Sequence, residues 1–189
     1  MNERAIKAVR EFLAAMGLDP DAAELKRTPE RVANLFADLF SGLEQRTDDI
    51  WGELLPEGDG SLVAVRRIPF CSICEHHLMP FFGEINLVYL PSSTGVAGFG
   101  KFLTLAKILS RRPQLQERLT AEIAAAIMAG LSAKGVLVKI EAQQFCLLAA
   151  QEWAKDTKTV TTVAQGELKC GSPLYEAALS MLEEKNANV

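Results

Sequence analysis

The sequence predicts an α+β fold in which helices precede a ββααββ unit and a further helix closes the chain. Two observations carry this prediction. Apolar residues recur at helical spacing between residues 6 and 43, whereas from residue 61 the apolar period changes to two, which is typical of strands. The chain has 189 residues, of which 49% are hydrophobic, enough for a buried core. We assign a helical N-terminal part to residues 1–60 and the sheet domain to residues 61–189.

Two helices and a connector are expected in the N-terminal part. Asn2 can cap the first helix and Gly17 can end it. The second helix is predicted to start at Thr28-Pro29, because a capping residue is followed by a proline suited to the first turn. Residues 44–60 are acidic and irregular, which indicates a connector with a short helix.

The sheet domain is expected to pair four strands antiparallel, with its two middle helices packed on one face. The alternation of the third strand continues through Gln144 and Cys146, so these side chains should share a face. The uncovered face and the strand edges predict self-association. The predicted elements are strands at 61–68, 82–90, 136–142 and 157–166, and helices at 98–111, 113–131 and 173–184.

Composition excludes several classes of protein. The formal net charge of −4 argues against a nucleic-acid-binding surface, and no apolar run is long enough to span a bilayer. The charged residues near the start are unlike a signal peptide. Four cysteines in a chain of this size fit a reducing compartment better than a disulfide framework, so we expect a cytoplasmic protein.

The segment richest in reactive side chains is Cys71-Ser72-Ile73-Cys74-Glu75-His76-His77, which contains both histidines of the chain. Thiolate and imidazole are preferred zinc ligands, and a spacing of three allows a turn to bring Cys74 and His77 onto one ion. Glu75, His76 and Cys71 can supply proton transfer or a fourth ligand. The alternative is that the two cysteines are buried thiols without a metal.

Several motifs together closely resemble the GTP cyclohydrolase I family: Cys74-Glu75-His76-His77, Gly98-Phe99-Gly100-Lys101, the run from Arg112 to Thr120, and Phe145-Cys146. Residues 28–33 and 40–43 are similar to the helical N-terminal part of that family. The resemblance implies the tunnelling fold, in which four-stranded sheets of several subunits join into a barrel. It also implies a homodecamer with active sites at subunit junctions.

The resemblance also implies the metal site. Its zinc ligands match Cys74, His77 and Cys146, and three protein ligands leave one position for water. In the family this water attacks C8 of the guanine ring. A histidine that matches His76 handles the proton of the ring nitrogen. Cys71, which the family usually lacks, is either packed in the turn or a fourth ligand that would close the open position.

The substrate contacts implied by the resemblance are partly retained. Glu117 and the neighbouring Gln116 match the residues that hold the 2-amino-4-oxo edge of guanine. Lys101 and Arg31 match residues of the phosphate pocket. The remaining phosphate-pocket positions differ, since a serine, two arginines and a lysine are replaced in this chain by Gly100, Thr104, Ala150 and Asn34.

A catalytic position also differs, because Gln144 stands where the family has a second catalytic histidine. Glutamine cannot carry a proton near neutral pH. Lys155, Lys158 and Arg111 are candidate replacements for the missing phosphate-pocket cations. The residues for metal and ring binding are thus retained, whereas those for phosphate binding and proton transfer are altered. This combination predicts little or no turnover of GTP.

Three interpretations follow. The first is a zinc-dependent hydrolase that acts on a purine-like or pterin-like ring and has diverged from GTP. The second is a GTP cyclohydrolase I that makes 7,8-dihydroneopterin triphosphate, with its losses compensated or neutral. The third is a non-catalytic oligomer that binds such a ligand or a protein partner. His76 and Glu117 favour an enzyme, because a binding protein needs no proton-transfer group beside an open metal.

Overall fold

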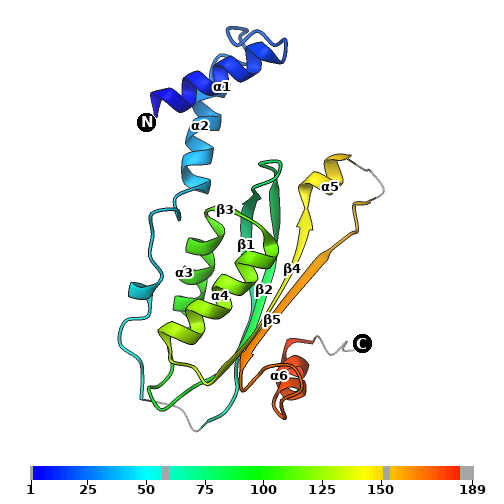
Figure 1. The fold of residues 1–189 in the computed structure, drawn as a ribbon. Helices are drawn as coiled ribbons and strands as arrows, with labels where there is room; N and C mark the ends of the chain where they lie inside the picture. The colour runs from blue at the N-terminus through cyan, green and yellow to red at the C-terminus, as the bar shows by residue number, and fades with distance from the viewer. Residues whose placement is uncertain (1, 57–59, 151–153, 184–189) are drawn as a thin grey trace, which may run out of the picture. The chain divides into compact units, whose positions relative to one another are not determined.

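The computed structural model describes residues 2–56, 60–150 and 154–183. The chain forms two compact units, Met1–Ser41 and Gly42–Val189. Two helices make up the first unit, and the second contains the sheet with its covering helices (Figure 1). This confirms the α+β class. The predicted domain boundary at residue 60 stays a prediction. No helix in the described ranges is both long and apolar enough to cross a membrane.

Both predicted helices are present in the first unit. Helix α1 spans Glu3–Ala15, and the side chain of Asn2 caps it by accepting from the amide of Ala5 at 3.2 Å. Helix α2 spans Thr28–Leu39. Thr28 was predicted to be its cap, which is wrong: Arg27 holds the capping position and makes no side-chain capping bond, so Thr28 is already the first helical residue, followed by Pro29 in the first turn.

The second unit contains the remaining elements. A short 3-10 helix, η1, lies in the connector at Asp48–Ile50, as predicted. The strands are β1 (Val63–Cys74), β2 (Pro80–Leu90), β3 (Pro113–Gln114), β4 (Gly135–Gln144) and β5 (Thr159–Gly166). The helices are α3 (Gly100–Ser110), α4 (Gln116–Gly130), α5 (Phe145–Ala150) and α6 (Tyr175–Leu182).

The sheet has five strands in the order β3-β1-β2-β4-β5. Four of them pair antiparallel, as predicted, but β3 pairs parallel with the end of β1. Pro113 was expected to start a helix, and the structure corrects this. The buried side chain of Gln114 holds the segment to its neighbours by donating to Glu122 at 2.8 Å, and an edge strand tolerates the missing amide hydrogen of Pro113.

The predicted alternation through Cys146 is also wrong. Strand β4 ends at Gln144, which pairs with Phe81, and Cys146 lies in α5. The next residue of β2 is Pro80, which has no amide hydrogen to continue the ladder. The chain therefore leaves the sheet after Gln144, so Gln144 and Cys146 do not share a strand face.

Helices α3 and α4 cover one face of the sheet, as predicted (Figure 1). The core between these layers contains alternate residues of β2 and the apolar row of α4. It includes Phe81, Ile85, Leu87 and Tyr89 of β2 and Leu119, Ile123 and Ile127 of α4. Helix α6 covers part of the opposite face, where it packs on Val88 and Leu137, and this cover was not predicted.

The two edges of the sheet are unlike. Strand β5 forms one edge over its 8 residues. At the other edge, β3 pairs only with Ile73 and Cys74, so most of β1 has no neighbour on that side within the described residues.

Candidate functional site

The candidate site lies where several elements meet at one end of the sheet. Cys74, at the end of β1, pairs with Gln114 of β3, and α4 begins two residues later. On the other side of β1, strand β2 brings Phe81 opposite Gln144, the last residue of β4. The β1–β2 turn, the start of α4 and the β4–α5 junction are therefore neighbours (Figure 1).

The turn between β1 and β2 carries both histidines. The amide of Leu78 donates to the carbonyl of Cys74 at 2.9 Å, and the amide of Cys74 donates to the carbonyl of Met79 at 2.8 Å. Leu78 has a φ of 51°, so the turn uses a left-handed residue that is not glycine. Cys74 is buried, whereas His76 and His77 are exposed, with ring centroids 6.3 Å apart.

Arg118 ties this turn to α4. Its Nη2 donates to the carboxylate of Glu75, and its Nε donates to Oε1 of Gln114 at 2.9 Å. The hydrogen bond from Arg118 holds the pKa of the Glu75 carboxyl below its ordinary value, against a smaller opposing effect of desolvation. Sequence reasoning missed this pair, although both residues belong to motifs that carry the family resemblance.

A network of amide and hydroxyl groups joins α4 to β4 and β5. Gln116 is 4% exposed, and its Nε2 donates to the carbonyls of Ile140 at 3.2 Å and Thr159 at 3.1 Å. Its Oε1 accepts from Nε2 of Gln144 at 2.8 Å. The side-chain amide of Gln116 is thus hydrogen-bonded inside the protein and links the start of α4 to β4 and β5. Its predicted contact with a ring edge stays a prediction.

We expect Gln116→Leu to lower the free energy of unfolding by about 1–3 kcal/mol, because Gln144 and Thr159 lose a shared buried partner. The measurement is a urea unfolding curve of the full chain. Glu117→Gln is the matched control, since Glu117 is the exposed neighbour on the same turn and its change should leave the midpoint in place. Equal midpoints for Gln116→Leu and the unmodified chain would contradict the bracing role.

The predicted substrate residues are not all at this end of the sheet. Glu117 is exposed on the first turn of α4, next to Gln116. Lys101 lies on the first turn of α3, whose other end leads into β3. A helix of 11 residues is about 16 Å long, so Lys101 is distant from Cys74 within one chain. Arg31 is exposed on α2, in the first unit.

The altered phosphate-pocket positions carry neutral side chains. Thr104 donates its hydroxyl to the carbonyl of Gly100 at 3.2 Å, and Ala150 is exposed at the end of α5. Lys158, a candidate replacement cation, donates from its ammonium group to Glu141 at 2.6 Å within its own chain.

The donor set at this site has the chemistry that zinc prefers, namely two thiols and an imidazole. Backbone pairing brings the segments that carry Cys74, His77 and Cys146 to the same end of the sheet. Within residues 2–56, 60–150 and 154–183, however, no three His, Cys, Asp or Glu side chains are gathered closely enough to form a metal-binding group. The three predicted ligands therefore have the right chemistry for zinc, and their segments lie at the same end of the sheet. That their side chains meet at one ion stays a prediction.

Cys71 lies on the other face of the sheet from Cys74. It pairs with Phe82, and side chains three residues apart on a regular strand point to opposite faces. Desolvation raises the pKa of the Cys71 thiol, with a smaller opposing effect of Arg111. This placement argues against Cys71 as a fourth zinc ligand.

Comparisons with known proteins agree with the motifs. A model of the GTP cyclohydrolase I family matches residues 5–183. Proteins named GTP cyclohydrolase 1 from Streptococcus agalactiae serotype Ia and Streptococcus gordonii are 40% and 41% identical to this chain. The alignments cover 96% and 95% of this chain, and 97% and 96% of the relatives. Among solved structures, the apo form of the archaeosine synthase QueF-Like matches with a TM-score of 0.45 and 18% identity, over 56% of this chain and 94% of that one.

Proposed function

Because the chain belongs to the GTP cyclohydrolase I family, we propose that it opens the guanine ring of GTP and yields 7,8-dihydroneopterin triphosphate. The observation that carries this proposal is the similarity to GTP cyclohydrolase 1 proteins over nearly the whole chain. It favours GTP over the diverged substrate that the altered phosphate-pocket residues predict.

Cys74, His77 and Cys146 are the residues that would hold zinc at this site. When bound there, zinc would supply an acidified water for attack on C8 of the ring. The buried thiol of Cys74 lies at the end of a paired strand, and the two backbone hydrogen bonds of the turn fix the path of the chain to His77. His76, exposed on the same turn, would transfer the proton at the ring nitrogen.

Glu117 supplies the recognition of the ring. A carboxylate can accept from two adjacent N–H groups, which is the pattern that the amino edge of guanine presents. Gln116 holds the start of α4 against β4 and β5, and Arg118 holds Glu75 of the turn against the same helix. These contacts fix Glu117 and His76 on elements that are tied to each other.

Phosphate binding requires a second chain in this proposal. Lys101 is at the far end of α3 from Cys74, so it cannot serve the candidate site of its own chain. A site at a subunit junction would place Lys101 beside the triphosphate of a neighbouring chain, and Arg31 is the second cation that the family resemblance assigns to phosphate binding. The unpaired edges formed by β5 and by the free part of β1 support assembly of this kind.

We therefore expect a symmetric homo-oligomer larger than a dimer, with a decamer as the form that family resemblance implies. The physical reason is that β5 and the free part of β1 present unpaired backbone groups that a neighbouring chain can pair. Light scattering on the purified chain at micromolar concentration measures the mass. A mass near the 20.6 kDa of one chain would contradict assembly.

The proposed reaction is tested by incubating zinc-loaded protein with GTP while following released formate and pterin fluorescence. Formate and pterin produced together at ordinary enzyme rates, about 1 per second or faster, support the proposal. Absence of both products, with guanosine, guanine and pterins also left intact, would reject it and favour the non-catalytic binding protein.

A second candidate function rests on Gln144. Its side chain is hydrogen-bonded to Gln116 and to Thr159, and as a neutral amide it offers no proton near neutral pH. This favours a hydrolase that opens a purine-like or pterin-like ring and does not complete the pterin. Formate, or a ring-opened formylamino product, in the absence of pterin would distinguish it from the first proposal.

A further inference from the structure

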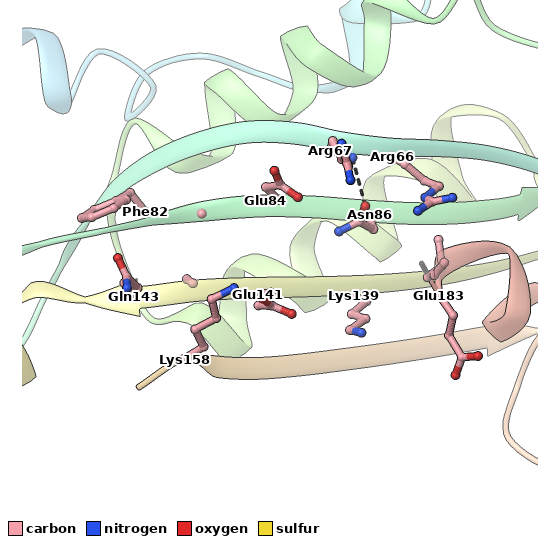
Figure 2. Close-up of a pocket in the computed structure, with 13 residues that line it drawn as sticks. Arg66, Arg67, Phe82, Glu84, Asn86, Lys139, Glu141, Gln143, Lys158 and Glu183 are labelled. Carbon is pink, nitrogen blue, oxygen red and sulfur yellow. Dashed lines mark hydrogen bonds and ion pairs between the residues drawn. The ribbon is translucent and has the colours of Figure 1, made fainter. Parts of the chain in front are cut away.

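A cavity of about 830 Å³ lies on the sheet face away from α3 and α4, beside the end of α6 (Figure 2). Side chains of β1, β2 and β4 form its floor. Lys139 lines it, whereas Gln144, five residues further along β4, points to the helix-covered face. The sheet thus separates this cavity from the candidate site.

A β-bulge shapes one end of the cavity. Val65 pairs with Leu87 and Ile68 pairs with Ile85, so Arg66 and Arg67 stand opposite the single residue Asn86. Arg67 has a φ of 56°, and its amide donates to Oδ1 of Asn86 at 2.9 Å (Figure 2). A non-glycine residue in this conformation persists only where its surroundings hold it. The bulge lets both arginines line the cavity.

Arg66 and Lys139 flank Asn86 from the two neighbouring strands. Lys139 is the direct partner of Asn86 on β4, and Arg66 lies across from Asn86 on β1. Adjacent strands are about 4.8 Å apart, so the two cations start about 10 Å apart and can converge above Asn86. Among the residues that the structure describes, neither has an acidic partner. Two cations at this spacing can both donate to one anion that lies between them.

The next residues on this face are acidic. Glu84 of β2 and Glu141 of β4 are direct partners, about 7 Å along the strands from Asn86 and Lys139. Lys158 neutralises Glu141 through an ion pair of 2.6 Å. In the described part of the chain, Glu84 has no such cation. An extended polyanion would be repelled by the carboxylate of Glu84. A compact anion that also carries a hydrogen-bond donor could bind the two cations with its anionic group and donate to Glu84.

We propose that this cavity binds a small zwitterion. Its phosphate or carboxylate group lies between Arg66 and Lys139, above the amide of Asn86, and its ammonium or N–H group donates to Glu84. The volume lies in the usual range for small-molecule sites, about 300–1,000 Å³. The site is distinct from the ring-opening chemistry and does not depend on it.

Isothermal titration calorimetry of the full-length protein tests this proposal with O-phosphoethanolamine, γ-aminobutyrate and inorganic phosphate. We expect O-phosphoethanolamine or γ-aminobutyrate to bind more tightly than inorganic phosphate. The tighter of the two identifies the anionic group. Arg66→Gln and Lys139→Gln should each weaken binding by about 10- to 100-fold, because each removes a charge-assisted contact. Glu84→Gln should abolish the preference for the zwitterion while inorganic phosphate still binds.

Lys158→Gln is the matched control, because Lys158 lines the same cavity but is already paired with Glu141. It should change affinity by less than about threefold, as expected for a cation outside the contact. Equal losses in Lys158→Gln and Arg66→Gln would show only a diffuse charge effect and overturn the proposal. Absence of heat with all three probes would overturn it as well. Neither result bears on the GTP assay, so failure of this site and failure of the proposed reaction are separable.

Discussion

Cys146→Ala is expected to reduce bound zinc from about one ion per chain to a small fraction of that value. Cys146 follows the end of β4 on the first turn of α5, and it is the only predicted ligand outside the β1–β2 turn. Removing it leaves Cys74 and His77, which are too few to hold the ion. Removing a residue that only hydrogen-bonds to a metal ligand already weakens metal binding by about 10- to 100-fold, so loss of a direct ligand should exceed that range.

Metal analysis of purified protein measures this effect, and GTP turnover should fall in parallel. Cys71→Ala and Cys170→Ala are the controls, because both cysteines are exposed and lie outside the predicted ligand set. Full zinc retention in Cys146→Ala would reject the ligand assignment. Loss of zinc in Cys71→Ala would instead show that Cys71 reaches the ion despite its place on the other sheet face.

Gln144→His separates the two candidate functions: it is expected to increase pterin formation by about 100- to 10,000-fold if the missing proton transfer limits the reaction, and to change the rate by less than about tenfold if the unmodified chain already makes pterin at ordinary enzyme rates. Gln144 faces the start of α4, where its Nε2 donates to Oε1 of Gln116. An imidazole at this position can donate to the same oxygen and also carry a proton. The measurement is pterin fluorescence together with formate release, at equal zinc loading of both proteins.

Gln144→Leu is the matched control for this gain, because it removes the hydrogen bond to Gln116 without adding a titrating group. No pterin gain in Gln144→His would argue that proton transfer at this position is not the barrier. Thr104→Arg then tests the phosphate pocket, since it restores a cation at a position where the family resemblance expects one. An unchanged KM for GTP in Thr104→Arg would show that the missing arginine at this position does not limit GTP binding.

The sequence predicted best where one physical pattern dominates. Period-two alternation located β2, β4, β5 and the first half of β1, whose continuation to Cys74 was not predicted, and helical periodicity located α3, α4 and the two N-terminal helices. It failed where a contact distant in sequence decides the local structure. Pro113 looked like a helix start, but pairing with β1 and the buried contacts of Gln114 hold it in a short strand.

The same distinction applies to the candidate site. The types and the spacing of Cys74, His76 and His77 predicted a metal site from the sequence alone. The hydrogen bonds of Gln116 could not be predicted in this way, because only the fold shows that this residue is 4% exposed and that its side-chain amide donates to β4 and β5. The bulge at Arg66 and Arg67 was equally hidden, since an inserted residue leaves no mark in a strand that still alternates on both sides.

The inequality of the two sheet edges has a consequence for mixtures of chains. If the edges join between subunits, β5 of one chain meets the free part of β1 of the next, so each subunit contributes one edge of each kind. A chain with a proline in the middle of β5 could accept a neighbour on one side and would reject one on the other. Such a chain would join a growing ring through its intact edge and would then prevent the next subunit from being added. A minor fraction of defective chains would therefore inactivate a much larger fraction of intact ones.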